Sequence, residues 1–402
     1  MRVLAPCPPA VPDLHAHARL HGTGHRTRDL LTELERSGLR GRGGASRPLG
    51  PELHRVRQEA GRTGTPAVVV VNGVEGEPLS RKDAHLLRTE PHLVLDGAQA
   101  VATAVGAADV VVCAPAGPVL AAVDTALAER RATRWPLDRV PVRTAASAPG
   151  FVAGQESALV AHLDGRAARP RGDGVPLARR GLAGRPTLVK NVETLAHAAL
   201  VARHGALRFR EEGTAEDPGT LLLTLALPHR PPRVVEVPHG APLEDVLRAG
   251  GSPRTAGVLL GGLHGGWVRP QDTAVPLTRA AVAAVGGRLG AGVVHVLPDD
   301  ACPLVETART TAHLAGQSVR QCGPCTFGLP RLAELTAALA SCRLAPAAVR
   351  ELHRTLGLLA DRGACRHPDA SARTVASALV AFAADVDAHA AGHCLVGGVV
   401  AA

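Results

Sequence analysis

The sequence predicts an α/β protein whose first part is a mostly parallel sheet, followed by a small α+β module and a helical bundle. Three short apolar runs, at residues 66–72, 109–114 and 140–145, have the composition of strands buried on both faces. Alanine- and leucine-rich stretches at helical spacing separate these runs. Such alternation of strands and helices is typical of a parallel sheet.

In this first part the helices are expected at residues 30–36, 86–107 and 119–132. Parallel sheets bind their ligands beyond the carboxyl ends of the strands. The loop NGVEGEP, residues 72–78, directly follows the first strand and falls at that edge. It is therefore a candidate ligand-binding loop.

The pattern changes near Gly219. Short strands are expected at residues 220–226, 233–237 and 257–260, and a short helix at residues 242–248 lies between them. This part is predicted to be a small α+β module, and a further strand is expected at residues 293–297.

The tail is almost entirely helical in pattern. Four helices joined by short loops predict a bundle. The helices are expected at residues 305–315, 329–340, 346–361 and 371–389. The expected domains are residues 25–215, 216–285 and 286–402.

With 402 residues the chain can form two or three separate cores. Its net charge is +9, but the arginines are scattered, and four Phe, two Trp and no Tyr leave few rings for base stacking. This composition argues against nucleic-acid binding.

Eight unevenly placed cysteines and the absence of a signal-peptide pattern predict a cytoplasmic protein. No run reaches the roughly 18 to 20 apolar residues of a spanning helix, so any contact with the inner face of a membrane is expected through partners.

Four glycines fall within residues 38–44, in the segment GLRGRGG. Without Cβ atoms, glycines let main-chain N–H groups approach a ligand, and neighbouring arginines add positive charge, a combination suited to phosphate. The candidates for this contact are Gly41, Arg42, Gly43 and Gly44. The segment is not a dinucleotide fingerprint because no strand precedes it, and a plain flexible loop is an equal alternative on this segment alone.

Two carboxylates follow the first buried strand. Glu75 and Glu77 flank Gly76 at the expected ligand edge. There they would accept hydrogen bonds from a ribose or a flavin ring. Solvated glutamates in an ordinary turn are the alternative.

Four separated segments, in order along the chain, resemble the flavoprotein subunit of respiratory complex I, the FMN- and NADH-binding (F-type) subunit of NADH:quinone oxidoreductase. Residues 38–50 are similar to that family's GLRGRGGAGFPTG, and residues 72–83 to its NADEGEPGTFKD. The third segment, residues 154–159, 185–187 and 191–195, is similar to GEETAL, KPT and NNVETL. The fourth is Cys322-Gly323-Pro324-Cys325.

This resemblance implies a Rossmann-like FMN domain, a middle β-grasp (SLBB-like) module and a helical bundle that carries an iron–sulfur site. Hydride would pass from NADH to FMN, and electrons would leave one at a time through a [4Fe–4S] cluster. No catalytic side chain is implied, because the cofactors carry the redox chemistry. The residues implied to bind the cofactors are Gly41, Arg42, Gly43, Gly44, Asn72, Glu75, Glu77, Phe151, Gly154, Glu156 and Asn191.

Several departures from the family pattern fall on the nicotinamide side. Arg47 stands at an aromatic position and Glu52 at a lysine position, which removes a stacking surface and reverses a charge. Val74, Gln155 and Lys190 replace an aspartate, a glutamate and an asparagine. FMN binding is therefore better supported than NADH binding, and another donor or a changed direction of electron flow is an alternative.

The cysteine motif departs as well. The family carries CxxCxxC and a distant fourth cysteine, but Val319 occupies the first position here. Cys322, Cys325 and Cys365 remain of the four thiolates that a cubane takes, and a cluster could be held by these three with an open or substituted corner. The candidate replacement is Cys394, just past the last helix.

Cys342 is the next candidate for the fourth ligand. Two alternatives to an iron–sulfur cluster remain. One is a zinc ion bound by Cys322, Cys325, Cys365 and Cys394, and the other is a redox dithiol formed by Cys322 and Cys325. Cys7, Cys113 and Cys302 are expected to be buried small apolar residues.

The leading hypothesis is an electron-transfer oxidoreductase that passes electrons from NADH or another donor through FMN to an iron–sulfur cluster. The acceptor would be quinone-linked, or a ferredoxin-like or 2Fe–2S subunit of the same hetero-oligomer. The alternative is a non-catalytic paralogue that keeps the fold as an assembly or zinc-binding subunit, favoured by Arg47, Glu52, Val74 and Val319. The flavin assignment depends on one condition: the glycine loop and the acidic loop must face the same cavity.

Overall fold

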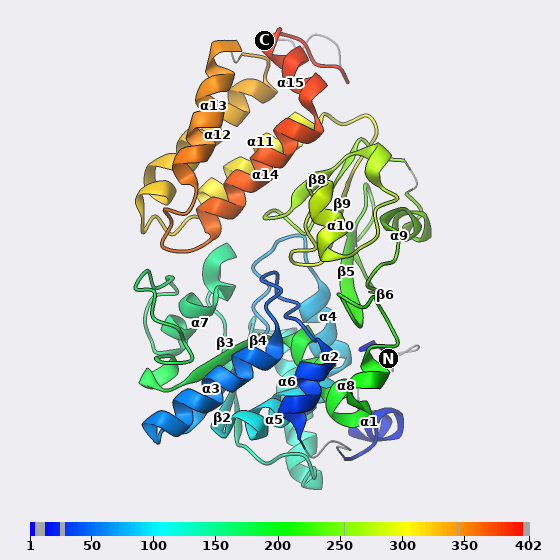
Figure 1. Ribbon diagram of the computed structural model, residues 1–402, viewed down its shortest axis with the longest axis vertical. Helices are drawn as coiled ribbons and strands as arrows, with labels where there is room; N and C mark the ends of the chain where they lie inside the picture. The colour runs from blue at the N-terminus through cyan, green and yellow to red at the C-terminus, as the bar shows by residue number, and fades with distance from the viewer. Residues whose placement is uncertain (5–12, 25–28, 253, 344–345, 397–402) are drawn as a thin grey trace.

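The computed structural model describes residues 1–4, 13–24, 29–252, 254–343 and 346–396. A parallel sheet with its helices forms one end of the long axis, a helical bundle forms the other, and a second sheet lies beside the junction (Figure 1). No helix in these described ranges is long and apolar enough to cross a membrane.

Four parallel strands in the order β3-β2-β1-β4 form the first sheet. They are β1 (Ala67–Asn72), β2 (Ala107–Ala114), β3 (Val142–Ala146) and β4 (Thr187–Asn191). Side chains alternate between the two faces, so Val69 and Val71 enter one hydrophobic core while Val68 and Val70 enter another. β1 and most of β2 are buried, as their continuous apolar runs predict, and so is β4. The prediction is wrong for β3, which lies at the edge of the sheet and has only half-buried and exposed residues.

The larger core packs helices from well-separated parts of the chain against one face. These are α2 (Leu30–Ser37), α3 (Leu49–Thr63), α4 (Lys82–Thr89), α5 (Pro91–Val105), α6 (Pro118–Thr133) and α8 (Val192–Phe209). The other face is covered by α7 (Glu156–Leu163), with short 3₁₀ turns at Phe151–Gly154 and Leu182–Gly184. A helix α1 (Leu14–His21) lies beside α5 and α6.

Two features of this part differ from the prediction. The single helix expected at residues 86–107 is two helices that meet at Glu90, because the ring of Pro91 disfavours helical geometry in the residue before it. The strand β4 was not expected, since it is short and contains Lys190. Its position next to β1 completes the ligand edge of the sheet.

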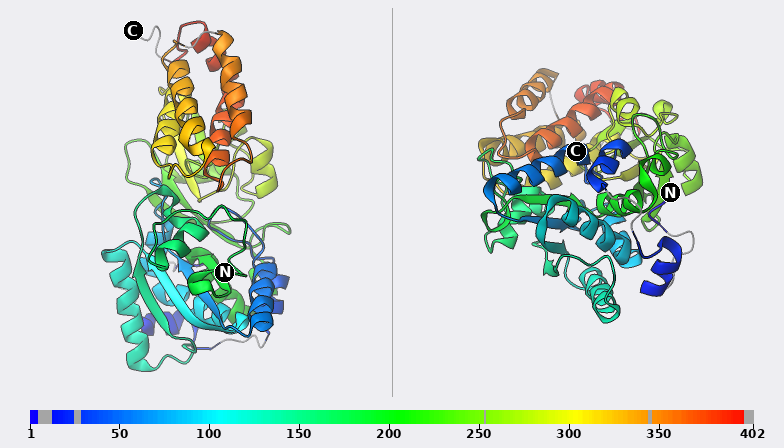
Figure 2. Two further views of the ribbon diagram at one scale, coloured as in Figure 1. Left: turned by 90° about the vertical axis from the view of Figure 1, so that its left-hand side faces the viewer. Right: turned by 60° about the horizontal axis from the view of Figure 1, so that its bottom comes forward.

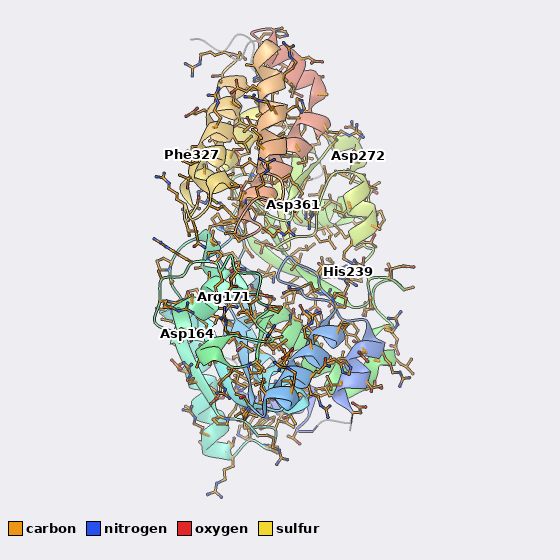
Figure 3. All side chains as sticks on the ribbon, turned by 60° about the vertical axis from the view of Figure 1, so that its left-hand side comes forward. Asp164, Arg171, His239, Asp272, Phe327 and Asp361 are labelled. Carbon is orange, nitrogen blue, oxygen red and sulfur yellow. The ribbon has the colours of Figure 1, made fainter. Side chains whose placement is uncertain are left out.

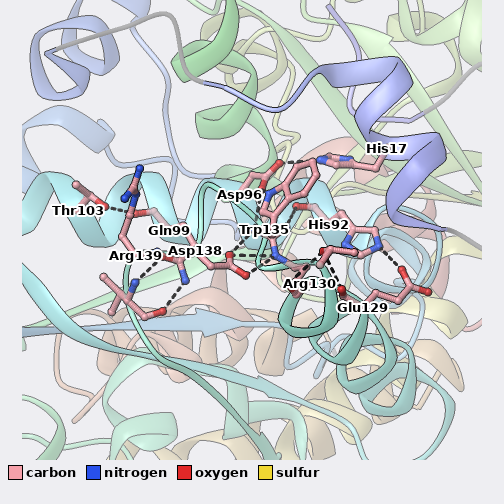
Figure 4. Close-up of polar contacts among 12 residues, drawn as sticks. His17, His92, Asp96, Gln99, Thr103, Glu129, Arg130, Trp135, Asp138 and Arg139 are labelled. Carbon is pink, nitrogen blue, oxygen red and sulfur yellow. Dashed lines mark hydrogen bonds and ion pairs between the residues drawn. The ribbon is translucent and has the colours of Figure 1, made fainter.

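A buried charge cluster joins α1, α5 and α6 (Figure 4). Arg203 of α8 also pairs with its central carboxylate. The Asp96 carboxylate, which is fully buried, accepts hydrogen bonds from Arg130 at 2.8 Å, from Trp135 Nε1 at 3.0 Å and from Arg203. His17 Nε2 lies 2.7 Å from the second oxygen. Burial alone would raise the pKa of Asp96, but these partners lower it well below its ordinary value, so the cluster is a structural ion pair network.

The second sheet is mixed, in the order β6-β5-β9-β7-β8, with β5 and β9 parallel and the other pairs antiparallel. Its core packs against α9 and α10. The elements are β5 (Thr220–Ala226), β6 (Arg233–Pro238), α9 (Leu243–Gly250), β7 (Gly257–Leu260), β8 (Gly266–Val268), a 3₁₀ turn at Pro270–Asp272, α10 (Arg279–Ala284) and β9 (Val293–Leu297). A helix on a mixed sheet is compatible with the expected β-grasp module, which stays a prediction, as do the domain limits.

The helical end contains α11 (Pro303–Gly316), α12 (Leu329–Ala340), α13 (Pro346–Leu359), α14 (His367–Ala381) and α15 (Ala383–Ala390), with a π-helical turn at Pro324–Gly328. The long helices run along the long axis of the molecule (Figure 2). The helix expected at residues 371–389 is broken at Phe382, which has φ −121° and ψ 43°. The cysteine loop between α11 and α12 lies at the end of the bundle nearest the first sheet (Figure 1).

Candidate functional site

Asn72 and Asn191 are neighbours across the carboxyl edge of the first sheet, as the last ladder pair of β1 and β4. Asn72 Nδ2 donates to the Gly154 carbonyl at 2.9 Å. Asn191 caps the N-terminus of α8, where its Oδ1 accepts the Glu193 amide at 3.0 Å. The sheet thus brings three predicted site residues together.

The glycine loop lies against the same edge. A Cβ atom on Gly43 would lie 3.1 Å from Cβ of Asn191, so the loop backbone approaches Asn191 as closely as a residue without a side chain allows. Gly44 has φ +97°, which favours glycine. The Arg42 amide donates to Thr194 Oγ1 of α8 at 2.9 Å, fixing the loop at the start of that helix.

The loop also has the features of an anion site. Gly43 is exposed, and within the described chain the amides of Gly43 and Gly44 donate no hydrogen bond. Nε of Arg42 is buried without a hydrogen-bond partner in the described residues, although it lies 4.0 Å from Glu193. Free amides, an arginine and the N-terminus of α8 together suit a phosphate. The residues present therefore fit the phosphate end of a flavin mononucleotide.

Beneath the loop is a buried ion network that the sequence reasoning missed. Lys82, only 2% exposed, donates to Asp83 at 2.6 Å and to Glu193 at 2.9 Å. Burial alone would lower the pKa of Lys82, but these two carboxylates raise it above its ordinary value. Asn191 Nδ2 donates to Asp83 at 2.7 Å. Both Lys82 and Glu193 lie inside the motif segments, but only their burial reveals the network.

The acidic loop turns its first carboxylate toward α4. Glu75 accepts the Ser80 hydroxyl at 2.5 Å and the amides of Asp83 and Ala84 at 3.0 and 3.1 Å. These amides belong to the first turn of α4, so Glu75 holds the start of that helix. A contact between Glu75 and a cofactor stays a prediction.

Glu77 points toward the second sheet instead. Its carboxylate accepts the Leu79 amide at 3.2 Å and the Leu263 amide at 2.8 Å. Burial raises the pKa of Glu77 to about 7, although both amides lower it. Glu77 therefore links the first sheet to the second; its predicted cofactor contact is likewise untested.

Phe151 and Gly154 lie in the turn that faces the acidic loop. A Cβ on Gly76 would lie 2.5 Å from the Phe151 carbonyl, so the two loops touch through their backbones. The Phe151 ring meets His264 edge-on, with centroids 4.7 Å apart, and its amide donates to Gln317 Oε1 at 3.2 Å. Phe151 therefore connects the candidate flavin edge with the cysteine loop of the bundle.

A hollow of about 270 Å³ opens beside Glu156, between the start of α3, the start of α7 and β4. Arg47 bridges Glu52 at 2.6 Å and Glu156 at 2.5 Å, and Lys190 pairs with Glu52. Three of the departures from the family pattern thus contact one another. Glu52 carries a negative charge where the family has a lysine, and the positive charges of Arg47 and Lys190 balance it.

Arg171 enters this hollow from the long loop between α7 and β4 (Figure 3). Its guanidinium donates to the carbonyls of Arg180 at 2.8 Å and Val175 at 3.0 Å, which fixes its position. Its Nε is buried without a hydrogen-bond partner in the described residues and lies 3.9 Å from Asp173. A second hollow, of about 980 Å³, lies at the opposite, amino-terminal edge of the sheet and is lined by none of the predicted site residues.

Three cysteines gather at the end of the bundle that faces the first sheet. Cys322 and Cys325 lie in the turn before α12, and Cys365 in the loop before α14. Burial raises the pKa of the Cys325 thiol to about 11, and the nearby thiols of Cys322 and Cys365 act in the same direction. Gln321 donates to the Pro170 carbonyl at 2.5 Å, which joins this loop to the first domain. The three thiols fit three corners of an iron–sulfur cluster.

The fourth predicted ligand, Cys394, is in the wrong place. Cys394 groups with Cys302 and His389, not with Cys322 and its neighbours. Cys302 precedes α11, whereas Cys322 follows it, and a helix of 14 residues is about 21 Å long. The zinc site of Cys322, Cys325, Cys365 and Cys394 is excluded for the same reason.

The second candidate, Cys342, follows the C-terminal end of α12 and is also far from the cysteine loop. Cys302 is half-buried beside a histidine, not an inert apolar residue. Cys113 is fully buried in β2 as expected, and Cys7 lies outside the described residues.

Comparisons with known proteins match the two regions of the chain that contain these candidate sites. Residues 34–199 match the Nuo51 FMN-binding domain family, and residues 306–389 match the NADH-ubiquinone oxidoreductase-F iron–sulfur binding region. The F-type subunit of NADH-quinone oxidoreductase from Mycobacterium tuberculosis (strain ATCC 25618 / H37Rv) is 32% identical over 324 residues, which cover 76% of this chain and 73% of that protein. The corresponding protein of Streptomyces coelicolor is 28% identical over 378 residues, covering 91% and 84%.

A solved structure of NAD⁺-reducing [NiFe]-hydrogenase in the H₂-reduced state has a TM-score of 0.82 and 27% sequence identity with this chain. The match covers 90% of this chain and 62% of the hydrogenase chain, so this chain spans less than two thirds of that protein's length. The FMN-binding match and the iron–sulfur match fall on the glycine-loop edge and on the helical bundle, respectively. The chain belongs to the family of F-type subunits of NADH-quinone oxidoreductase.

Proposed function

We propose that this chain is the flavin-bearing electron-entry subunit of a hetero-oligomeric NADH:acceptor oxidoreductase. The observation that carries the proposal is the meeting of the glycine loop, Asn72 and Asn191 at one sheet edge, joined through Phe151 to the loop that holds Cys322 and Cys325. Nothing in the comparisons favours a non-catalytic paralogue. A ferredoxin-like or 2Fe–2S subunit, or a quinone-linked acceptor, would take the electrons, and any membrane association would be through partners.

The chain's own residues would bind and orient the flavin. The free amides of Gly43 and Gly44, with the Arg42 charge, would hold its phosphate. Asn72 and Asn191 would fix the edge of the site from the sheet. Bound FMN would supply the chemistry that protein side chains lack, taking up a hydride and releasing electrons singly.

The hollow beside Glu156 is the proposed entry for the nicotinamide dinucleotide. Four cations line it, against three acidic residues: Arg47, Arg55, Arg171 and Lys190 face Glu52, Glu156 and Asp173. A net positive hollow attracts the diphosphate of NADH. Arg47 stands at the position of the family's aromatic residue and pairs with both Glu52 and Glu156. It would have to move or to contact the dinucleotide directly.

The test is an ultraviolet–visible spectrum of the chain reconstituted with FMN, iron and sulfide, taken before and after NADH is added. Bleaching of the flavin band is expected. A flavin band that does not respond to NADH would contradict NADH oxidation while leaving flavin binding intact, and a chain that binds no flavin would contradict the whole proposal.

Arg171→Met tests the entry hollow. A hydrogen bond to a charged group contributes about 1.5–3 kcal/mol, so KM for NADH should rise by about 10- to 100-fold if Arg171 contacts the diphosphate. The reduction rate at saturating NADH should change little. Arg254→Met, at an exposed arginine of the second module, is the matched control and should leave KM unchanged.

A further inference from the structure

Cys302, His389 and Cys394 bring two thiols and an imidazole nitrogen to within 4.8 Å of one another. They come from three places in the chain: the residue before α11, the last turn of α15, and the segment that follows α15. Cys302 Sγ lies 3.4 Å from His389 Nε2. This cluster is at the end of the bundle farthest from the first sheet, where α15 lies (Figure 1).

The histidine is already oriented as a ligand. His389 is fully buried, and its Nδ1 lies 3.0 Å from the Leu339 carbonyl of α12. A carbonyl only accepts, so Nδ1 carries the proton and Nε2 presents its lone pair to the thiols. A second hydrogen bond of this kind is the usual support of a metal-binding histidine.

The segment after α15 is folded back to bring Cys394 into the cluster. The Gly392 amide donates to the His389 carbonyl and the His393 amide to the Ala388 carbonyl, both at 3.1 Å, and Gly392 has φ +92°. Cys394 is 7% exposed, whereas its neighbours His393 and Leu395 are exposed. The segment thus buries the Cys394 thiol against Cys302 and His389, although the residues on either side of it are exposed.

We propose that Cys302, His389 and Cys394 bind a zinc ion that fastens α15 and the segment after it to the ends of α11 and α12. Two thiolates and one imidazole are ligands that Zn²⁺ favours. Structural zinc is four-coordinate, which leaves the fourth position to Cys342, two residues past α12, or to a water. The site is separated from the cysteine loop by the length of α11 and is distinct from the iron–sulfur site.

The experiment measures zinc and iron by mass spectrometry in the full-length chain, purified under reducing conditions and reconstituted with iron and sulfide. About one zinc per chain is expected in the unmodified protein, as a single site requires. Cys394→Ala and His389→Gln should each abolish zinc retention and leave iron unchanged. Cys322→Ala should lower iron and leave zinc unchanged, and Cys113→Ala, at a buried cysteine outside both clusters, should change neither metal.

Binding is measured separately with Co²⁺ added to the metal-free, reduced full-length chain. Thiolate-to-cobalt bands and the visible bands of tetrahedral Co²⁺ are expected, and Zn²⁺ should displace them. Loss of an outer hydrogen-bond partner alone weakens metal sites by about 10- to 100-fold, so Cys394→Ala should weaken cobalt binding by more than about 100-fold. Because Cys322, Cys325 and Cys365 can also bind Co²⁺, the titration is run on Cys322→Ala as well, in which the bands of Cys302, His389 and Cys394 should remain.

Three results would overturn the proposal. One is a zinc-free unmodified chain that gives no tetrahedral cobalt spectrum. Another is zinc that is lost in Cys322→Ala and kept in Cys394→Ala, which would place zinc in the cysteine loop. The third is a Cys302–Cys394 disulfide in the reduced purified chain, seen as an intact mass two hydrogens lower and a cross-linked peptide.

Discussion

Asn191 is the residue at which the sheet, the glycine loop and the buried ion network meet. Its Oδ1 caps α8, its Nδ2 donates to Asp83, and its Cβ touches Gly43. One short amide side chain therefore serves helix stability and loop position together. The same functions cannot be taken over by a longer side chain without displacing the glycine loop.

Asn191→Ala should lower both stability and flavin affinity. Loss of an N-cap costs about 1 kcal/mol, and the Asp83 carboxylate loses a donor as well. Alanine keeps the Cβ beside Gly43 but removes the amide that is proposed to fix the edge of the flavin site, so the Kd for FMN should rise by about tenfold or more. Urea unfolding and fluorescence titration with FMN measure the two effects.

Thr278→Ala is the matched control, since Thr278 caps α10 in the second module. It should cost a similar free energy of unfolding and leave the Kd for FMN unchanged. Equal Kd values in the two variants would show that Asn191 acts on the helix alone.

Much of the candidate site could be predicted from the sequence because it lies in short segments with distinctive composition. The strand before Asn72 indicates the ligand-binding edge of the sheet, and the glycines around Arg42 indicate that the backbone can approach a ligand closely. Both can be recognised from the sequence alone. Lys82 and Glu193 could not be recognised as a buried pair, since burial depends on the second sheet packing over them. Likewise the pairing of Arg47 with Glu52 and Glu156 depends on how α3 packs beside β4, which composition does not encode.

At the scale of elements, α11 and α12 separate two groups of cysteines that look equivalent in the sequence. Cys322, Cys325 and Cys365 lie at one end of these helices, and Cys302, Cys342 and Cys394 at the other. The spacing of the cysteines along the chain does not reveal which of them share an end of the bundle. In an antiparallel bundle successive loops alternate between the two ends, so cysteines close in sequence can lie at opposite ends. The cysteine loop therefore keeps three thiols, and its fourth position stays at Val319.

Val319→Cys should complete the iron–sulfur site. Val319 is half-buried in the loop between α11 and α12, at the start of the motif spacing. A fourth thiolate there would hold the corner that three thiolates leave open, so the iron content after reconstitution and brief exposure to air should rise from about three to about four per chain. Iron and sulfide analysis and electron paramagnetic resonance measure the change.

Val380→Cys, at a residue of α14 that is 80% exposed, adds a thiol away from the loop and should leave the iron content unchanged. If both variants raise it equally, the added thiol acts without regard to position. An unchanged content in Val319→Cys would mean that the loop does not hold a cluster with an open corner.

At the scale of the whole molecule, Glu77 is a buried link between the first sheet and the second module. Its folded-state pKa of about 7 lies above the ordinary value of 4.5, so the folded protein holds this proton more tightly than the unfolded chain does. The stabilising contribution is complete below about pH 4.5 and is lost as the pH rises through 7. At about 1.4 kcal/mol per pKa unit, the loss amounts to about 3 kcal/mol.

Glu77→Gln should remove this pH dependence. Thermal unfolding between pH 5 and pH 8 should show the unmodified chain losing stability relative to Glu77→Gln over that range. Glu211→Gln, at an exposed residue after α8, is the control and should follow the unmodified chain. Parallel curves for all three proteins would mean that Glu77 is ionised throughout.

The flavin edge and the cysteine loop belong to different parts of the chain, but Phe151, Gln317 and Gln321 join them. A ligand that binds only the folded state stabilises the segments that it contacts. At a ligand concentration 100 times the Kd, this stabilisation is about 2.7 kcal/mol. FMN bound at the sheet edge should therefore protect the turn at residues 150–156 and, through it, the loop at residues 317–325.

Hydrogen exchange with and without FMN measures this coupling. Exchange at residues 41–44 and 72–77 should slow by up to about 100-fold at such a concentration, since these amides would border the flavin in the proposed site. A smaller slowing is expected at residues 317–325, because that loop responds only through Phe151 and Gln317. In Gln317→Ala the second effect should disappear while the first remains. Residues 14–21 of α1, on the far side of the first domain, should exchange equally with and without FMN; protection spread evenly over the chain would contradict a coupling carried by these contacts.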